Sequence, residues 1–392
     1  MKIIFAADMS FNYLPKFPGV EAANACMKEA GALMASADFS MLNLENIFGV
    51  AENNIPLTKN GPNLISSPDF AAYVHALHPT VVGLANNHTK DYGEGPMTFT
   101  KELLEKDGYV CIGAGKNLED AYRPAILEKD GTRVAIVAVC ENEFGTADEQ
   151  TSGTAGYRLS MVSHLIADAK NNGALPIIYF HGGHETYPYP SPARQELYRH
   201  FVELGAAAVI CMHTHCPQGY EIYQGAPIVY SMGNLFFPNF PGMSETSSWY
   251  YGYMSELVIE NGNVSLLTHP YRFDTNAIYL LKGTEKDAFD AYMAYINKPI
   301  ASAQALRDLF DSWCLVPSRF GYYQSLTSFD MELLADGNDK KITALKNVFG
   351  CEAHNELVKN MLFMIYENRV EAARAGVEKI LTLQKMQIPS EN

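Results

Sequence analysis

Six hydrophobic segments of this sequence end in side chains that carry oxygen or imidazole donors. The donors, segment by segment, are Asp8; Asn43 and Glu45; Asn86, Asn87 and His88; His181; His213 and His215; and Asn234. Carboxylates, amide oxygens and imidazoles together suit manganese, iron, zinc or magnesium, whereas a set of thiolates would indicate structural zinc. Two such cations about 3.5–4 Å apart make hydroxide available near neutral pH and stabilise charge on an attacked phosphoryl or acyl group. The sequence therefore predicts a site for two divalent metal ions.

The pair His213 and His215 follows the apolar run AAAVICM with one residue between the two imidazoles. In an extended strand, residues i and i+2 point to the same face, so both rings are expected to project together. The alternative is a strand end whose two histidines are solvated or structurally satisfied. Because five other segments end in the same kinds of donor, we interpret both histidines as metal ligands.

These donors depend on strands that bring them to one place. Strands are predicted over residues 2–8, 39–45, 80–88, 175–183, 206–215 and 220–234, the last as two strands of which the second ends at Asn234. Helices are predicted over residues 20–37, 67–77, 95–109, 160–173 and 191–205. In an open α/β sheet, ligand sites form beyond the carboxyl ends of the strands. We therefore expect the donors to meet at one edge of a layered α/β domain.

Two hairpins and a change from strand patterns to helical periodicity complete the expected organisation. Asp130-Gly131 and Asn261-Gly262 have the composition of tight hairpin turns. From about residue 284 the spacing of apolar residues becomes helical, with few strand signals. We therefore predict a domain over residues 1–280 and a helical carboxy-terminal region over residues 281–392.

The composition is that of an ordinary globular protein, with 47% hydrophobic and 19% charged residues among 392. The net charge of −15 argues against a nucleic-acid partner, but it is compatible with an anionic substrate because metal ions set their own local field. Seven scattered cysteines without a CxxC pair indicate a reducing compartment. The apolar run at residues 3–7 is too short for a signal peptide, so we expect a cytoplasmic protein without a membrane segment.

Several residues also have an interpretation without any role in chemistry. Asn86 and Asn87 could be turn residues only, because Asn tolerates a left-handed backbone. Six further histidines lack clustered partners and are interpreted as structural or exposed: His75, His78, His164, His200, His269 and His354. The aromatic stretches at residues 238–242 and 247–253 are interpreted as a packed loop or as a substrate-facing one.

The motifs AAD, NLE, ANNHTKDYG, HGGHE, MHTHCPQ and YSMGN occur in an order and approximate spacing similar to the CapA family. These are bacterial capsule-synthesis or poly-γ-glutamate-biosynthesis proteins, and the match covers about residues 1–275. The family resembles the calcineurin-like metallophosphoesterases. The resemblance therefore implies an α/β fold, an αββα two-sheet sandwich with a dinuclear metal centre, followed here by a helical carboxy-terminal extension.

The resemblance also implies a role for each motif residue. The implied metal ligands are Asp8 and His215 for one ion, Asn87, His181 and His213 for the other, and Glu45 as the bridge between them. His88 would face the substrate as a proton donor or oxyanion stabiliser, with Asp91 orienting it. The candidates for substrate contact are Asn43, His184, Glu185 and Asn234, of which Asn43 could equally be a strand-end residue and His184 and Glu185 could orient ligating histidines.

Three positions depart from the pattern of the resemblance. Phosphoesterases of the broader class usually begin Asp-x-His, and here the third position is Ser10, which leaves the first metal short of one imidazole. The bridging residue, usually Asp, is Glu45. The fourth motif often reads HWGxE, whereas here Gly182 replaces the aromatic residue and His184 is additional.

The resulting hypothesis is a metal-dependent hydrolase in which metal-activated water attacks a phosphoester or related bond of a small or polymeric anionic substrate. One alternative is a metal-dependent hydrolase, or an accessory protein, acting on γ-glutamyl amide bonds. The other alternative is a non-catalytic binding module on the same fold.

Overall fold

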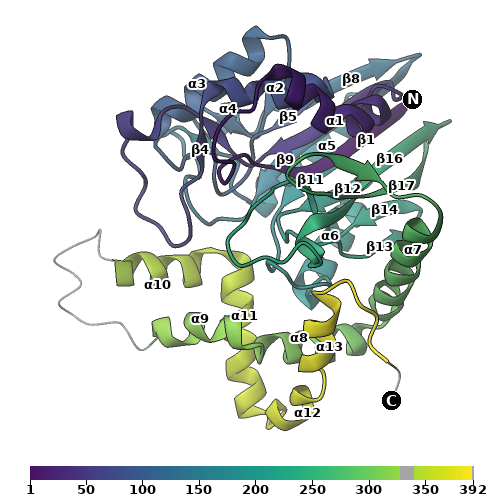
Figure 1. The fold of residues 1–392 in the computed structure, drawn as a ribbon. Coiled ribbons are helices and arrows are strands. Elements are labelled where there is room, and N and C mark those ends of the chain that lie inside the picture. Colours follow the sequence, from purple (N-terminus) through teal and green to yellow (C-terminus); the bar gives the residue numbers. More distant parts are fainter. Residues whose placement is uncertain (327–339, 391–392) are drawn as a thin grey trace.

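Two β-sheets packed face to face form the centre of the protein in a computed structural model that describes residues 1–326 and 340–390 (Figure 1). The first sheet contains, in pairing order, β18 (Ile278–Leu280), β17 (Asn263–Phe273), β16 (Tyr251–Glu260), β1 (Lys2–Met9), β2 (Phe39–Leu44), β5 (Val81–Gly83) and β6 (Val110–Ile112), with β15 (Asn234–Phe236) also pairing with β1. The second contains β13 (Tyr220–Tyr223), β14 (Ala226–Val229), β12 (Ala208–Met212), β11 (Leu175–His181), β9 (Thr132–Cys140) and β8 (Ala125–Lys129). Two small ribbons are β3 (Ile47–Phe48) with β4 (Ile65–Ser66), and β7 (Ala114–Gly115) with β10 (Gly153–Thr154).

Helices form the outer layers and the carboxy-terminal part of the chain. Those of the sandwich are α1 (Val20–Met34), α2 (Ala71–Leu77), α3 (Glu94–Lys106), α4 (Leu118–Ala121), α5 (Leu159–Asn171) and α6 (Pro192–Leu204). Those beyond it are α7 (Gly283–Asn297), α8 (Ala303–Cys314), α9 (Phe320–Ser325), α10 (Lys340–Gly350), α11 (Glu352–Tyr366), α12 (Val370–Arg374) and α13 (Val377–Leu383), with the short turn η5 (Pro317–Arg319) before α9.

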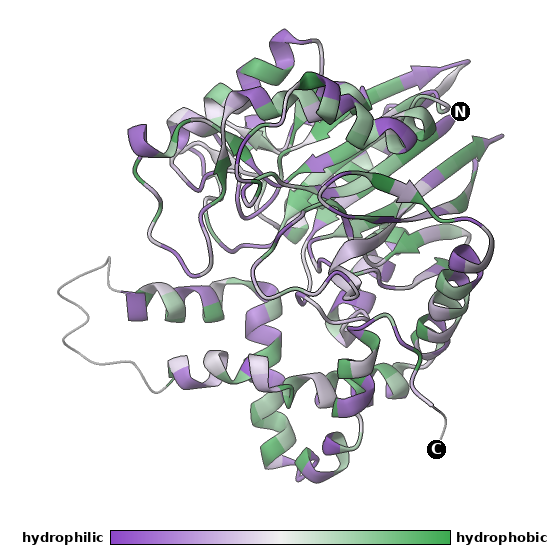
Figure 2. Ribbon diagram, viewed as in Figure 1, coloured by the Kyte–Doolittle hydropathy of each residue, from purple (hydrophilic) through white to green (hydrophobic). Residues whose placement is uncertain are grey.

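The layers follow from the alternation of side chains along each strand. In β1, Ile3 and Phe5 belong to the hydrophobic cluster between the two sheets, whereas Ile4 packs in a separate cluster with α1 and α2. In β9, Ile136 faces the space between the sheets and Val137 packs with α5 and α6. The central strands of both sheets are therefore apolar on both faces, and Figure 2 shows much green along the strands of the sandwich. The predicted αββα sandwich with a helical carboxy-terminal extension is confirmed.

Parallel strands in both sheets bring their carboxyl ends toward the site. In the first sheet β1, β2, β5 and β6 are parallel, and in the second β9, β11, β12 and β14 are parallel. The ends of the two sets meet, because Asp8 at the end of β1 accepts a hydrogen bond from the backbone N–H of His213, just after β12, at 2.8 Å. The edge at which the donors gather therefore lies at the junction of the two sheets.

Both predicted hairpin turns form, but some predicted strands end earlier than expected; β5, for example, ends at Gly83 and not at His88. Asp130 and Gly131 have φ of 49° and 76°, and Asn261 and Gly262 have φ of 52° and 80°, as tight hairpin turns require. The strand before Asn234, however, ends at Val229. Asn234 instead begins β15, where it lies opposite Asp8 in a parallel pairing.

The helical part of the chain begins where the strands end, since β18 ends at Leu280 and α7 begins at Gly283. Its apolar residues share the cluster between the sheets, and Trp313 of α8 stacks on Tyr187 with ring centroids 5.0 Å apart. The division into two domains stays a prediction, and residues 327–339 and 391–392 of the second lie outside the described residues. Within the described ranges, no helix is long and apolar enough to cross a membrane.

A half-buried carboxylate connects α11 to the sandwich. Glu356 accepts hydrogen bonds from Ser191 Oγ at 2.6 Å, from Ala193 N at 3.1 Å and from His184 Nε2 at 3.2 Å. Ser191 at the same time caps α6 by accepting from Arg194 N at 3.3 Å. Burial raises the pKa of Glu356, but the hydrogen bond and charge of His184, together with the charge of Arg194 and the hydrogen bond from Ser191, outweigh it and hold the pKa below the ordinary value of 4.5.

Replacing Glu356 should therefore loosen the helical part. We expect Glu356→Ala to lower the free energy of unfolding by about 2–4 kcal/mol at pH 7, because it leaves buried donors without an acceptor. The loss should shrink as the pH falls below the ordinary value of 4.5 and through the lower pKa of the folded state, because the carboxylate is then protonated in both states. Urea denaturation followed by circular dichroism measures this, with Glu378→Ala on exposed α13 surface as the control. Equal stability of both variants would contradict it.

Candidate metal centre

The centre of the site is the carboxylate of Glu45, which follows β2 and is fully buried. Neither of its oxygens accepts a hydrogen bond from a described residue. Nε2 of His181 lies 3.7 Å from Oε1, Nε2 of His88 lies 3.7 Å away and Nε2 of His215 lies 3.8 Å away, which is too long for hydrogen bonds. Burial, reinforced by the negative charge of Asp8, raises the pKa of Glu45 well above its ordinary value. A buried carboxylate without partners is unfavourable, so these residues fit a bound divalent cation.

Three groups of side chains near Glu45 have the composition of metal sites. In each group the possible ligand atoms lie within 4.8 Å of one another: Glu45, His181 and His213; Asp8, Glu45 and His215; Glu185, His213 and His215. Glu45 belongs to two of these groups, and each of the first two unites a carboxylate with imidazole. All members of these two groups are buried. Their nitrogen and oxygen donors are those that manganese, iron and zinc prefer.

Asp8 is held in place by amide groups. Its Oδ1 accepts from Asn43 Nδ2 at 2.8 Å, and its Oδ2 accepts from the backbone of His213. Asn43 is fixed in turn, because its Oδ1 accepts from Asn86 Nδ2 at 3.2 Å. Asn43, predicted to contact substrate, therefore lies behind Asp8 and orients it.

The two histidines of the HxH motif reach the site through a turn, and not through an extended strand as predicted. β12 ends at Met212, and both histidines have left-handed backbone, with φ of 94° for His213 and 54° for His215. Such a conformation is strained for residues with a side chain, and it occurs mainly where the surroundings enforce it. The hydrogen bond from the His213 N–H to Asp8 is one such constraint.

Each ligand histidine is oriented by its neighbours. His215 Nδ1 donates to Asn234 Oδ1 at 2.8 Å, since that oxygen only accepts, and this leaves the Nε2 lone pair free toward Glu45. Asn234 itself is fixed by donating to the Trp249 carbonyl at 3.1 Å. On His181, Nε2 lies 3.1 Å from Asn87 Oδ1 and 3.0 Å from His213 Nδ1. The amide oxygen and both rings therefore converge, although a ligand role for Asn87 stays a prediction.

His88 and Asp91 lie beside the cluster as a hydrogen-bonded pair. His88 Nδ1 donates to Asp91 Oδ2 at 2.6 Å, and Asp91 also accepts from the backbone of Leu64. The buried ammonium of Lys59 forms an ion pair with Asp91 and lies 3.1 Å from His88 Nδ1. Burial and then the charge of Lys59 lower the pKa of His88, so the ring is neutral near pH 7 with its lone pair on Nε2.

Three positions that the resemblance singles out lie apart from the cluster around Glu45. His184 does not join the cluster: its Nε2 donates to Glu356 and its ring packs on Phe310 at 4.9 Å. Ser10 is fully buried, and its Oγ lies 3.4 Å from Asn46 Oδ1. Gly182 has no room for the aromatic residue of the resembling pattern, because a Cβ there would lie 2.5 Å from Glu141 Cγ.

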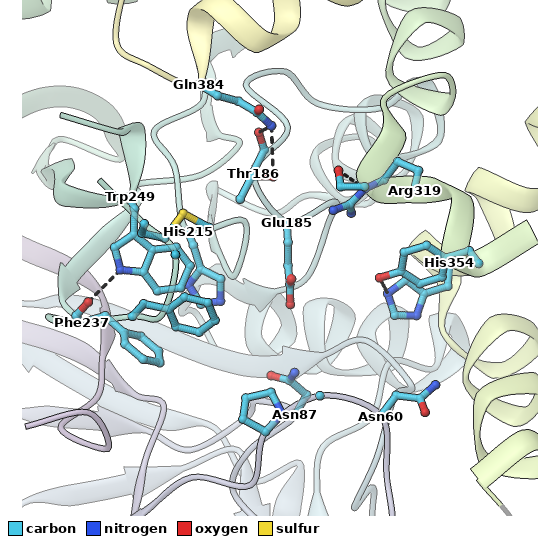
Figure 3. A pocket seen from close by; sticks show the side chains of 18 of the residues that line it. Asn60, Asn87, Glu185, Thr186, His215, Phe237, Trp249, Arg319, His354 and Gln384 are labelled. Carbon is cyan, nitrogen blue, oxygen red and sulfur yellow. Dashed lines mark hydrogen bonds between the residues drawn. The ribbon is translucent and has the colours of Figure 1, made fainter. Parts of the chain in front are cut away.

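A cavity of about 760 Å³ opens over the cluster (Figure 3). Asn87, His88, Glu185 and His215 line its base. An aromatic wall beside His215 is formed by Phe237, Phe240 and Trp249, with centroids of Phe240 and Trp249 4.2 Å apart. The loop at residues 59–64 forms another part of the wall, and the helical part of the chain contributes residues that include Arg319, Tyr322, His354 and Gln384.

Three lining residues were not found from the sequence. Lys59 lies in a loop without periodicity, and its role depends on contact with Asp91, which lies 32 positions later in the chain. His354, interpreted as structural or exposed, belongs to the cavity wall, with its Nε2 3.2 Å from the Tyr322 hydroxyl. Arg319 comes from a turn between helices. No local pattern marks these three, because distant packing creates their role.

Comparison with protein families matches residues 6–239 to the family described as "Bacterial capsule synthesis protein PGA_cap". The match covers more than half of the chain and contains every residue of the three ligand groups. The chain belongs to this family. The helical part after residue 280, which supplies one wall of the cavity, lies outside the match.

Curated relatives with related names support the capsule-synthesis family. The PGA biosynthesis protein CapA of Bacillus subtilis is 25% identical over 59% of this chain and 62% of its own length. The capsule biosynthesis protein CapA of Bacillus anthracis is 29% identical over 40% of each chain, and a probable polyglutamine synthesis accessory protein of Mycobacterium tuberculosis is 28% identical over 43% of this chain and 48% of its own. The chain therefore spans about half of the length of the curated relatives it matches.

Solved structures show more distant likeness to this member of the capsule-synthesis family. A novel phosphatase of Mycoplasma pneumoniae has a TM-score of 0.43 and 12% identity, covering 70% of this chain and 95% of its own. A 5'-nucleotidase precursor of Thermus thermophilus has a TM-score of 0.40 and 11% identity, covering 77% of this chain and 59% of its own.

The ligand groups predict how much metal the protein holds. We expect the wild type, purified without chelator, to contain about two divalent ions per chain by elemental analysis. His213→Ala/His215→Ala should lose them, because each group contains at least one of these imidazoles. His164→Ala/His200→Ala, outside the cluster, is the matched control. One ion in the wild type would indicate that the site without a histidine at position 10 is weak. No metal, even after incubation with manganese or zinc, would refute the metal centre.

The unpartnered Glu45 predicts an unusual effect on stability. Because the folded protein raises the pKa of Glu45, the metal-free protein should lose stability as the pH rises above the ordinary value of 4.5. Glu45→Gln removes this loss, so in chelator at pH 7–8 it should be more stable than the wild type by about 1–3 kcal/mol. Adding manganese should stabilise the wild type more than the variant. Urea titrations measure both effects, with exposed Glu52→Gln as the control, and a less stable Glu45→Gln in chelator would contradict the account.

Proposed function

We propose that this chain is a metal-dependent hydrolase that cleaves a phosphoester or related bond of an anionic substrate. The observation that carries the proposal is the position of Glu45, which belongs to two ligand groups and lies 3.7 Å from Nε2 of His88. A carboxylate common to two groups is the arrangement that two-metal hydrolases use to hold paired cations. The His88–Asp91 pair then places an acid–base group directly at the shared carboxylate.

The residues that would hold the cations are those of the first two groups. Asp8 and His215 would bind one ion, His181 and His213 the other, with Asn87 completing the second set and Glu45 between them. Divalent cations supply Lewis-acid chemistry here: they stabilise negative charge on the attacked group and make hydroxide available near neutral pH. Asn43 and Asn234 orient ligands and leave the net charge of the ligand set unchanged.

His88 handles protons in this proposal. The neutral ring holds its Nε2 lone pair toward the cluster, so it first accepts a proton and can then return it to the departing oxygen. The carboxylate of Asp91 fixes the tautomer through Nδ1 and stabilises the imidazolium that forms. Lys59 opposes this charge, which keeps the resting ring neutral and ready to accept.

Two other functions have a specific observation in their favour. The names of the curated relatives concern polyglutamate or capsule synthesis, which favours a hydrolase or accessory protein acting on γ-glutamyl amide bonds. Ser10 is turned to Asn46 and offers no imidazole, which favours a binding module whose first metal site is incomplete. Turnover separates the three functions.

The test uses metal-loaded protein with bis(p-nitrophenyl) phosphate, p-nitrophenyl phosphate and γ-glutamyl-p-nitroanilide. We expect phosphoester hydrolysis, and we expect His88→Gln to reduce kcat by a factor on the order of 10²–10⁴ while the metal content is unchanged. His164→Gln, an exposed histidine of α5, should retain full activity.

Other outcomes identify the alternatives. Release of nitroaniline without release of nitrophenol would replace the phosphoesterase by the amide hydrolase. Bound metal without turnover of any of the three compounds would favour the binding module.

A further inference from the structure

Arg319 is a cation without a carboxylate partner in the described part of the chain. It lies in η5 and lines the cavity, on the wall opposite His215 and Trp249 (Figure 3). Among residues 1–326 and 340–390, no carboxylate lies within ion-pair distance of its guanidinium, and the guanidinium donates one hydrogen bond, from Nε to Ser318 Oγ at 3.2 Å. Its terminal nitrogens are therefore available to a ligand in the cavity.

Two aromatic rings fix the orientation of this guanidinium. Its central carbon lies 4.6 Å from the ring centroid of Trp313 and 5.6 Å from that of Tyr322. Trp313 is fully buried, and the Tyr322 hydroxyl is held by His354 Nε2. Stacking restricts the side chain before any ligand binds, so less conformational entropy is lost when the guanidinium meets an oxyanion.

The wall that carries Arg319 is fastened to the sandwich on two sides. On one side, Glu356 of α11 accepts the three hydrogen bonds described above, and Glu352 accepts from Asn142 Nδ2 at 2.6 Å. On the other side, Gln384 donates to the Thr186 carbonyl at 2.8 Å, and its own carbonyl accepts from Ser248 N at 2.9 Å. The wall is thus part of the fold, and its distance from the metal ligands is set by these contacts.

We propose that Arg319 is a specificity residue that binds a second oxyanion, a carboxylate or phosphate, on substrates whose first anionic group lies at the ligand cluster. The proposal rests on the proposed function, because it needs the cluster to bind the first anion. Within the described part of the chain, no hydrogen bond or ion pair joins Arg319 to a residue of the ligand groups, so it meets a different part of the substrate. Glu143 and Glu185 also line the cavity, but Glu185 belongs to a ligand group and Glu143 accepts from Asn347.

Three compounds with one chain length test this directly: hexylphosphonate, 6-phosphonohexanoate and 1,6-hexanediphosphonate. Their carbon–phosphorus bonds are not hydrolysed, so isothermal titration of the metal-loaded protein reports binding alone. In the wild type, the second anion should lower Kd by about tenfold or more relative to hexylphosphonate. Whether the carboxylate or the phosphonate gains more identifies which oxyanion Arg319 prefers.

Arg319→Gln should abolish this gain and leave the Kd of hexylphosphonate unchanged. Arg307→Gln, an exposed arginine of α8, should keep the full gain. Arg319→Lys, which keeps the charge without the planar fork, should keep part of it and decides the question if Arg319→Gln does not fold.

Equal Kd values for the three compounds in the wild type, or a gain that persists in Arg319→Gln, would overturn the proposal while leaving the proposed hydrolase intact. Metal-loaded protein that binds none of the three would instead overturn both, because the cluster would then not bind the first anion.

Discussion

The burial of an unpartnered carboxylate is the constraint on which this structure depends. Glu45 lies at the junction of two sheets, where no backbone amide or side-chain donor of the described residues reaches its oxygens. Such a group destabilises a fold unless a cation compensates it, so the surrounding chain has to place donors around it from several elements at once. The meeting of parallel strand ends from both sheets is what achieves this, since β1, β2, β11 and β12 all end within reach of the same point.

Asparagines provide the framework around that carboxylate. Asn43 holds Asp8, Asn86 holds Asn43, and Asn234 holds His215. A carboxylate in any of these places would add negative charge and compete for the cation, whereas a lysine or arginine would repel it. Neutral amides supply both a donor and an acceptor, so they fix the geometry of the ligands without changing the charge that the metal experiences.

The parts of this arrangement that depend on local sequence patterns could be predicted from the sequence. Apolar runs closed by donors located Asp8, Glu45, His181, His213 and His215, and turn residues located both hairpins. It could not show that a left-handed turn delivers the HxH pair, because one constraint on that backbone is the hydrogen bond from His213 to Asp8, which is far away in the chain. It also could not show that Gly183, with φ of 129°, redirects the chain so that His184 faces Glu356. The cavity wall could not be predicted for the same reason, because Arg319 and His354 acquire their surroundings only through tertiary packing.

The order of these parts along the chain has a consequence for synthesis. Every member of the ligand groups precedes residue 216, whereas the hydrogen bonds that close the last wall belong to Gln384. Ribosomes add about 5–20 residues per second, so the intervening stretch of about 170 residues takes roughly ten to thirty seconds to make. During that interval the nascent chain already contains every residue of the candidate ligand groups but not the wall above them. If the proposed function holds, a metal ion can therefore reach these groups before the cavity is enclosed, and the cation most available beside the ribosome has the first opportunity to bind.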